Sequence, residues 1–376
     1  MRRPRFAGVL VLAAIVGGFV LAGILHSPRH ELVVGGVEDA AKWADPGGNM
    51  ALAARAGFRV IVLSSIWHRG LRAPSAADLA GIQRAVTAGD QDGIRSIVAV
   101  YFFARDTPLT AQQRADFAAY AASIARAIPE VRYMSVGNEP NSHVFWMPQF
   151  GPGGSDAAAS AYFELLRTAY DAVKKADPHV TVIGGSLASS GSDRPWRGYP
   201  SHSPTRFIED LGQAYRASGL GRPPLDLFSI HPYPANSSIP PTRSDPHSSS
   251  IGIADYPKLV RLLRGAFGKP PPIVYGEYGI QTVIPRDETD LYSGTRPSSI
   301  RAVTELRQAD DYIEAIHLAA CQPLVRMLIF FHVTDEAQLT GLQTGLFYPN
   351  GKPKASLGPV SASAQAAEKG QVKCGR

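Results

Sequence analysis

The sequence has few of the residues that define several classes of function. Only two cysteines occur in 376 residues, and charged residues make up 19% of the chain. The charges behind the formal net charge of +6 are scattered, and there is no long run of lysine or arginine. A nucleic-acid-binding protein would cluster its basic residues, so we do not expect a nucleic acid as a partner.

Motifs for metal, nucleotide and serine-nucleophile chemistry are also missing. The histidines His143, His179, His202 and His247 lack metal-ligand spacing, and no Gly-x-Ser-x-Gly elbow occurs. Residues 184–186, Gly-Gly-Ser, lack the Lys-Ser/Thr sequel of a phosphate-binding loop. No repeat at a solenoid period is present. We therefore predict that the protein uses neither a metal nor another cofactor.

The amino-terminal segment predicts export or membrane insertion. Phe6 to Leu25 carries no charged residue and follows an arginine-rich start that would stay cytoplasmic. Its length suits a retained anchor, whereas the small residues around 20–22 suit a cleaved signal, so residues 1–27 have two open interpretations. In both, residues 31–376 lie outside the cytoplasm, secreted or tethered to the membrane only through residues 6–25.

The two cysteines, Cys321 and Cys374, have two open interpretations. In an exported chain they could form a disulfide that ties the carboxyl-terminal tail to the helix before the last strand. The alternative is a pair of free thiols, because the sequence does not show whether the two Cα atoms come within bridging distance. The sequence leaves the oligomeric state open.

Eight apolar runs alternate with segments of helical spacing. The runs are Leu32–Val37, Phe58–Leu63, Ile94–Phe103, Val131–Val136, Val180–Gly185, Leu225–Ile230, Pro272–Tyr278 and Arg326–Phe331. The helical segments are Met50–Ala56, Ala76–Ala88, Thr110–Ile128, Ala157–Ala176, Ser203–Ser218, Ile253–Phe267 and Ser299–Cys321. Parallel strands that are buried on both faces read as continuous apolar runs. We therefore predict an α/β fold, a single-domain (β/α)8 TIM barrel over residues 31–376, behind the hydrophobic segment.

The loop lengths indicate which end of this barrel binds a ligand. Links from helix to strand are short, whereas the links after strands four to seven are long and rich in Gly, Pro and Ser. The longest runs from Ala235 to Gly252. Long loops gathered on one rim build a binding site there.

Two of the predicted strands end in a glutamate. Strand four runs into Gly137-Asn138-Glu139-Pro140, and strand seven ends in Gly276-Glu277-Tyr278. Strands four and seven face each other across an eight-stranded barrel, so Glu139 and Glu277 can project into the same mouth. Retaining glycoside hydrolysis needs two carboxyl groups about 5–5.5 Å apart. Repulsion between them raises the pKa of one, so that one can stay protonated while the other is charged.

These residues resemble the retaining glycoside hydrolases of clan A, which include the family 5 cellulases and the family 39 glycosidases. The resemblance spans nearly all of residues 32–355 and implies that Glu139 is the acid/base, Glu277 is the nucleophile, and Asn138 reaches the sugar 2-hydroxyl. His231-Pro232-Tyr233 resembles the strand-six element that contacts the nucleophile or the sugar. Two positions differ from the clan. Val62 stands where strand two often carries arginine, and Phe330-Phe331-His332 stands where strand eight often ends in tryptophan.

Further side chains near the strand ends are candidates for sugar binding. The aromatic residues Trp67, Trp146, Tyr233 and Tyr278 could stack on a sugar ring, and the alternative for each is packing in the core or a loop. His231 and His332 could hydrogen-bond a sugar or the carboxylates, and the alternative is an ordinary core or surface histidine.

The sequence thus predicts a retaining glycosidase that cleaves O-glycosidic bonds in a carbohydrate substrate with two glutamates. Two alternatives stay open. One is a non-catalytic barrel that binds glycans of the cell envelope, which the missing strand-two arginine motivates. The other is a transglycosylase, in which an acceptor sugar replaces water. The sugar, the linkage and the internal or terminal position of the cut do not follow from the sequence.

Overall fold

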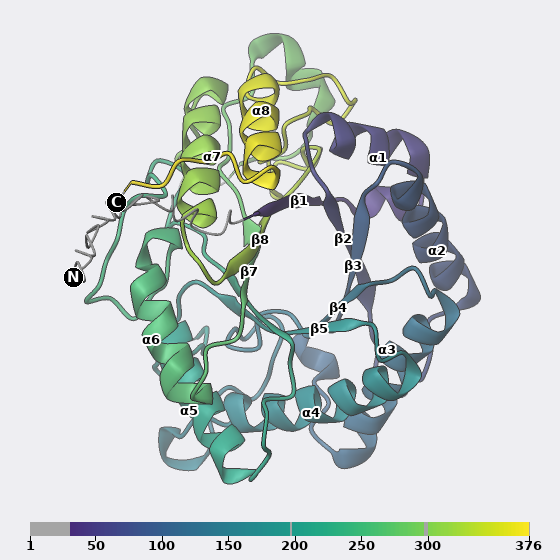
Figure 1. The fold of residues 1–376 in the computed structure, drawn as a ribbon, viewed down its shortest axis with the longest axis vertical. Coiled ribbons are helices and arrows are strands. Elements are labelled where there is room, and N and C mark those ends of the chain that lie inside the picture. Colours follow the sequence, from purple (N-terminus) through teal and green to yellow (C-terminus); the bar gives the residue numbers. More distant parts are fainter. Residues whose placement is uncertain (1–30, 196–197, 297–299, 376) are drawn as a thin grey trace, which may run out of the picture.

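Eight parallel strands close into a barrel in the order of the sequence (Figure 1). The computed structural model describes residues 31–195, 198–296 and 300–375. The strands are β1 (Val33–Val37), β2 (Val60–Ile66), β3 (Arg95–Tyr101), β4 (Tyr133–Val136), β5 (Thr181–Ala188), β6 (Leu227–His231), β7 (Ile273–Tyr278) and β8 (Val325–Phe330). Each predicted apolar run overlaps one of them, and the (β/α)8 prediction is confirmed.

Helices surround the barrel as an outer layer (Figure 1). They are α1 (Pro46–Arg55), α2 (Ala76–Gln91), α3 (Ala111–Ala127), α4 (Ala158–Ala176), α5 (Pro204–Ala217), α6 (Tyr256–Phe267), α7 (Glu305–Ala320) and α8 (Leu357–Glu368). Short 3-10 helices occupy parts of the connections: η1 (Asp39–Lys42), η2 (Ala104–Asp106), η3 (Pro152–Gly154), η4 (Ile253–Asp255) and η5 (Arg286–Leu291).

Two helices differ from the prediction. The last helix before β8 was expected from Ser299, but α7 begins at Glu305, because the Thr304 side chain accepts a hydrogen bond from the Arg307 amide (3.2 Å) and caps it there. Helix α8 was not among the predicted segments. It is rich in alanine and serine and has few large apolar residues, so its helical period is weak.

Two layers of apolar side chains form the core. Side chains from alternate strand positions fill the inside of the barrel: Val37, Val60, Ile97, Ile183, Leu227, Val274, Met327 and Ile329. The intervening residues pack outward against the helices in a second and larger cluster. This burial on both faces explains why the strands read as unbroken apolar runs.

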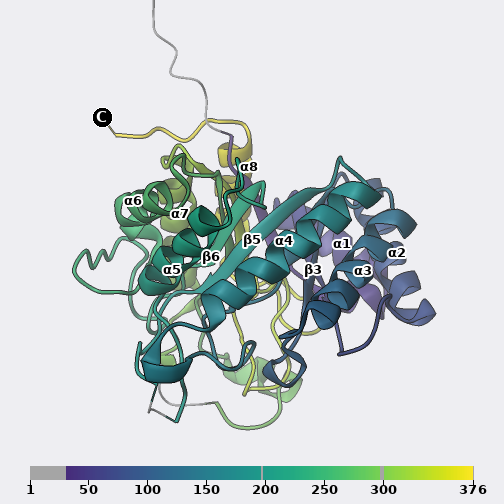
Figure 2. The same ribbon diagram turned by 90° about the horizontal axis from the view of Figure 1, so that it is seen from below.

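The two ends of the barrel differ. The long connections after β4 to β7 lie at the carboxyl ends of the strands, which we call the mouth, and the carboxyl terminus lies at the other end (Figure 2). Among the described helices, none is both long enough and apolar enough to cross a membrane. The predicted signal or anchor, residues 1–27, lies outside the described residues.

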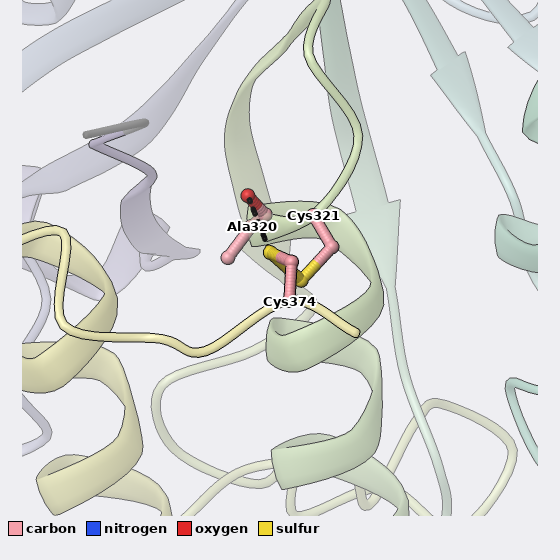
Figure 3. The surroundings of a disulfide bond; sticks show 3 residues. All are labelled: Ala320, Cys321 and Cys374. Carbon is pink, nitrogen blue, oxygen red and sulfur yellow. Dashed lines mark hydrogen bonds between the residues drawn. A yellow bond between two sulfur atoms is a disulfide. The ribbon is translucent and has the colours of Figure 1, made fainter. Parts of the chain in front are cut away.

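The two cysteines are joined in a disulfide (Figure 3). Cys321 follows α7, Cys374 lies in the tail after α8, and their Cα atoms are 5.4 Å apart. The disulfide interpretation is thus confirmed, and that of two free thiols is wrong. The bond ties the end of the chain to the helix that precedes β8.

We expect the Cys321→Ser, Cys374→Ser double variant to lose about 2–4 kcal/mol in free energy of unfolding, because the cross-link restricts the unfolded chain. Urea denaturation of the wild type and the variant, each with and without reductant, measures this loss. Wild type with reductant should match the double variant. Equal unfolding midpoints without reductant would contradict the prediction.

Candidate active site

The backbone after β4 turns sharply at the mouth, and this turn carries Glu139. Gly137 and Glu139 both have positive φ angles, 79° and 37°. The left-handed region costs a residue with a side chain about 1–3 kcal/mol, so the surroundings must stabilise it. The Glu139 amide donates to the Ser186 carbonyl (2.8 Å), and the Gly137 amide donates to the Val100 carbonyl (2.8 Å). Bonds to both neighbouring strands therefore fix the turn.

Tyr162 of α4 stabilises this turn. Its buried hydroxyl donates to the carbonyl of Val136 (2.9 Å) and accepts from the amide of Gly185 (2.7 Å). It thus joins the ends of β4 and β5. At the next residue, Ser186, β5 has a register irregularity, and the Ser186 and Ser135 hydroxyls lie 3.0 Å apart inside the barrel.

The loop after Glu139 is fastened to the loop after β5. Asn141 is fully buried, and its amide nitrogen donates to the carbonyls of Ala188 (3.2 Å) and His202 (3.0 Å). Its amide oxygen accepts from the Ala188 amide (2.9 Å). Gln149 adds a bond from its side-chain nitrogen to the Pro140 carbonyl (2.9 Å). Both sides of Glu139 are therefore restrained.

A β-bulge directs Glu277 into the mouth. Tyr275 pairs with Leu328, and Tyr278 pairs with Phe330. Between these two pairs β7 therefore has one residue more than β8. Both tyrosines then face the helices, and Glu277, which lies between them, is free to face inward. Gly276 makes the approach of β6 possible, because a Cβ atom there would overlap the Ser229 hydroxyl.

The prediction that Tyr278 stacks on a sugar is wrong. Its side chain is 1% exposed and packs against the rings of Tyr312 and Phe330, at 6.1 and 6.3 Å between centroids. The bulge at residues 276–277 is the reason, since it turns Tyr278 toward the helix layer.

The predictions for Trp67 and Trp146 are also wrong. Trp67 is 0% exposed, packs edge-on against Phe102 and Phe117, and donates its indole hydrogen to the Leu71 carbonyl (2.7 Å). Trp146 is 1% exposed and lies against Phe102 and Tyr162. Both loops fold back over the outer core, so the two indoles fill space there and do not line the mouth.

Glu139 and Glu277 meet at His231. The His231 Nδ1 lies 3.2 Å from Oε1 of Glu139 and 3.6 Å from Oε2 of Glu277. A carboxylate oxygen of Glu139, one of Glu277 and a His231 ring nitrogen all lie within 4.8 Å of one another. The Tyr233 hydroxyl donates to Glu277 Oε2 (3.2 Å). The structure thus brings four of the predicted residues together.

Burial and mutual charge shift the pKa values in this cluster. Burial raises the pKa of Glu277, and the charge of Glu139 raises it further. His231, the Tyr233 hydrogen bond and His332 oppose that rise. Burial disfavours the imidazolium form of His231, but the two carboxylates outweigh burial and raise its pKa. Burial, together with the charge of Glu277, raises the pKa of Tyr233 well above its usual value, so Tyr233 remains a donor.

Two further predicted residues lie at the mouth. Asn138 is partly exposed, and its side chain makes no hydrogen bond to another residue within the described ranges. His332, two residues after the end of β8, lies against the ring of Phe331 with its Nε2 3.6 Å from Glu336. Its charge lowers the pKa of Glu277, which places it on the same side of the mouth.

Some features of the site could not be found in the sequence. Tyr162 carries no motif and reads as an ordinary apolar helix position. Val62 packs against the core inside the barrel, so no charge from β2 reaches the mouth at that position. A cation does lie beside the end of β2: Lys42 of η1 donates to the Ser64 carbonyl (2.7 Å) and pairs with Asp39 (2.9 Å).

The same cluster could hold a metal ion. Glu139, His231 and Glu277 each offer one ligand atom at the mutual distances given above. The sequence indicated these three residues as a catalytic group and not as metal ligands, because they do not have metal-ligand spacing along the chain. Two carboxylates and one imidazole suit a divalent cation.

Comparison with known proteins shows what the chain is similar to. No protein-family model matches it, and no curated protein sequence matches it. Solved structures do. A family 39 glycoside hydrolase from the gut symbiont Bacteroides cellulosilyticus WH2 matches with a TM-score of 0.65 and 18% identity, over 90% of this chain and 64% of that chain.

Two further structures match over most of this chain. A GH5-4 broad specificity endoglucanase from Clostridium longisporum has a TM-score of 0.59 and 14% identity, over 92% of this chain and 98% of that chain. A monomeric β-xylosidase from Caulobacter crescentus CB15 has a TM-score of 0.57 and 17% identity, over 89% and 67%. The matching structures are clan A glycoside hydrolases, the group that the motifs resemble. At these identities the likeness establishes the fold.

We expect Tyr162→Phe to lower the free energy of unfolding by about 1–3 kcal/mol, because it leaves the Gly185 amide and the Val136 carbonyl without a partner in the core. Urea denaturation measures the change. Tyr170→Phe is the matched control on the same helix, since its hydroxyl makes only a 3.3 Å bond to Asp226 in a part-buried position. Equal losses in the two variants would contradict the role given to Tyr162.

Proposed function

We propose that the protein is a retaining glycosidase that hydrolyses O-glycosidic bonds of an oligosaccharide or polysaccharide by double displacement. The observation that carries the proposal is the approach of the Glu139 and Glu277 oxygens to within 4.8 Å at the barrel mouth. Retaining enzymes have their carboxyl groups about 5–5.5 Å apart, whereas inverting enzymes need about 6.5–9.5 Å to admit a water molecule. The observed approach favours retention.

The reaction proceeds in two steps on this geometry. In the first, a Glu277 oxygen attacks the anomeric carbon, the glycosidic bond breaks, and Glu139 gives its proton to the departing oxygen. In the second, Glu139 takes a proton from water, the water oxygen attacks the anomeric carbon, and Glu277 leaves as a carboxylate. Atoms and charge balance over the cycle, and no cofactor takes part.

The neighbours of the two glutamates favour this division of roles. The nucleophile must be ionised, and Glu277 accepts the Tyr233 hydrogen bond and lies near both His231 and His332. These groups stabilise its charged form against burial. Glu139 contacts His231 alone among these three groups, and its restrained backbone suits a group that must meet the leaving oxygen at hydrogen-bond distance. The side-chain amide of Asn138 makes no hydrogen bond to another described residue, and in this proposal it binds a sugar hydroxyl.

The proposal includes a location outside the cytoplasm. A disulfide persists in oxidising compartments and is rare in the cytosol, so the Cys321–Cys374 bond supports export. The apolar segment at residues 6–25 supports it independently.

We expect Glu277→Ala to abolish turnover of aryl glycosides, and Glu139→Gln to reduce turnover of unactivated glycosides by about 10²–10⁴-fold, since proton donation is lost. The assay screens wild type on a panel that begins with β-linked sugars, because matching structures include a β-xylosidase and an endo-β-1,4-xylanase. Glu164→Gln on the surface of α4 is the matched control and should keep full activity.

Three outcomes would redirect the proposal. Glycan binding without turnover, unchanged by Glu277→Ala, would favour the non-catalytic barrel. A product that incorporates an added acceptor sugar in preference to water would indicate a transglycosylase. Loss of wild-type activity in EDTA, with recovery on adding a divalent cation, would mean that the cluster works as a metal site.

We expect Tyr233→Phe to move the acidic limb of the kcat/KM profile to higher pH. The Tyr233 hydrogen bond lowers the pKa of Glu277, so its removal raises that pKa and leaves less ionised nucleophile at low pH. The pH profiles of wild type and variant on one substrate measure the shift. Tyr275→Phe changes a buried tyrosine of β7, the strand that carries Glu277, but one that faces the helices, and it should leave the limb in place. A shift to lower pH would refute the prediction.

A further inference from the structure

A groove of about 690 Å³ opens on the rim beside the carboxyl ends of β2 and β3. Residues of η1, of the loop after β2 and of α2 line it, together with Ser64 and Tyr101 from the strands. Its volume lies within the range of about 300–1,000 Å³ that is usual for small-molecule sites. None of the roles assigned above to Glu139, Glu277 and their contacts uses it.

The groove reaches the catalytic pair through Tyr101. This residue lines the groove and points into the barrel from the end of β3. Burial raises its pKa to about 12, and the charges of Asp39 and Glu277 both contribute to that rise. Tyr101 and Asp39 both line the groove, and Tyr101 is within range of the Glu277 charge.

An exposed tryptophan stands at the edge of the groove. Trp43 directly follows η1 and is 71% exposed, whereas the other described tryptophans, Trp67 and Trp146, are buried. The Lys42 ammonium lies 4.6 Å from its ring centroid and orients the ring. Ile66 and Leu71, 37% and 43% exposed, line the same groove. Exposed apolar groups that gather around a hollow typically mark a ligand-binding groove.

The charges of the groove balance one another. Asp39 pairs with Lys42 (2.9 Å), and His68 lies 3.0 Å from Asp106. Arg84 donates to the Lys42 carbonyl (3.2 Å), and Asp78 accepts from the Ser75 hydroxyl (2.6 Å). The two cations that line the groove, Lys42 and Arg84, are matched in number by two carboxylates, Asp39 and Asp78, so the lining offers no excess of positive charge to a carboxylate or sulfate. The polar atoms that remain suit the hydroxyl groups of an uncharged ligand.

We propose that this groove binds neutral sugar residues of the substrate chain next to the one that is cleaved, with Trp43 as the stacking platform. The flat apolar face of a sugar ring packs on the indole, and polar groups that line the groove hydrogen-bond the sugar hydroxyls. The inference rests on the proposed function and names its substrate class: an oligosaccharide or polysaccharide of uncharged sugars. Trp43 thereby becomes a determinant of chain-length preference.

Binding and turnover are measured separately on the full chain. Neutral gluco-, xylo- and manno-oligosaccharides of increasing length are titrated into Glu277→Ala and into Glu277→Ala/Trp43→Ala by calorimetry. We expect Trp43→Ala to weaken binding of the longer oligosaccharides about three- to tenfold. In the Glu277→Ala background it should leave the affinity for aryl monoglycosides unchanged, because these fill only the site of cleavage. Trp43→Phe should restore most of the affinity.

Leu220→Ala is the matched control. Leu220 is an exposed apolar residue, 40% exposed, in the connection between α5 and β6 at the opposite end of the barrel. With Leu220→Ala added, the Glu277→Ala protein should bind every oligosaccharide with unchanged affinity. Failure of wild type to cleave any glycoside would overturn the proposed function while the calorimetry still reports on the groove. Equal affinities with and without Trp43, no binding of any neutral oligosaccharide, or preference for an acidic one would overturn the inference.

Discussion

A buried imidazole between two carboxylates is the interaction on which the mouth of this barrel depends. Two charged glutamates within 4.8 Å of each other would repel strongly in a site with little water. His231, 3% exposed, can supply one compensating positive charge, and the carboxylates raise its pKa in return. The two carboxylates and the imidazolium together then carry a single net negative charge, or the three groups share one proton. This balance lets one carboxyl group act as an acid while the other acts as a nucleophile.

Local irregularities of the strands produce that arrangement. A regular parallel strand alternates its side chains and would not bring both glutamates inward at these positions. The left-handed backbone at Glu139, the bulge at Ser186 and the extra residue in β7 each break the alternation at the mouth. Hydrogen bonds from Tyr162 and from the neighbouring strands stabilise the breaks. The regular part of each strand supplies a rigid barrel, and its last two or three residues supply the site.

The same division explains what the sequence predicted and what it did not. Continuous apolar runs predicted the strands, because burial on both faces leaves a clear pattern. Glu139 and Glu277 were predicted because a strand end is a position along the chain, which the sequence shows directly. The errors at Trp67, Trp146 and Tyr278 concern side-chain direction. Direction depends on a bulge or on the path of a loop, and neither leaves a pattern in the residues nearby.

The two sides of the mouth differ in how firmly they are built. On the side of β4 and β5, Asn141 and Gln149 are buried and their amide groups bond to loop backbone. On the side of β1 to β3, Trp43 and Leu71 stand exposed around an open groove. Proton transfer tolerates little error in distance, so the restrained side suits the acid/base. Stacking on a sugar ring tolerates sliding, so the open side suits the binding of further sugar units that we propose, and the asymmetry of the rim agrees with the different precision that the two proposed tasks require.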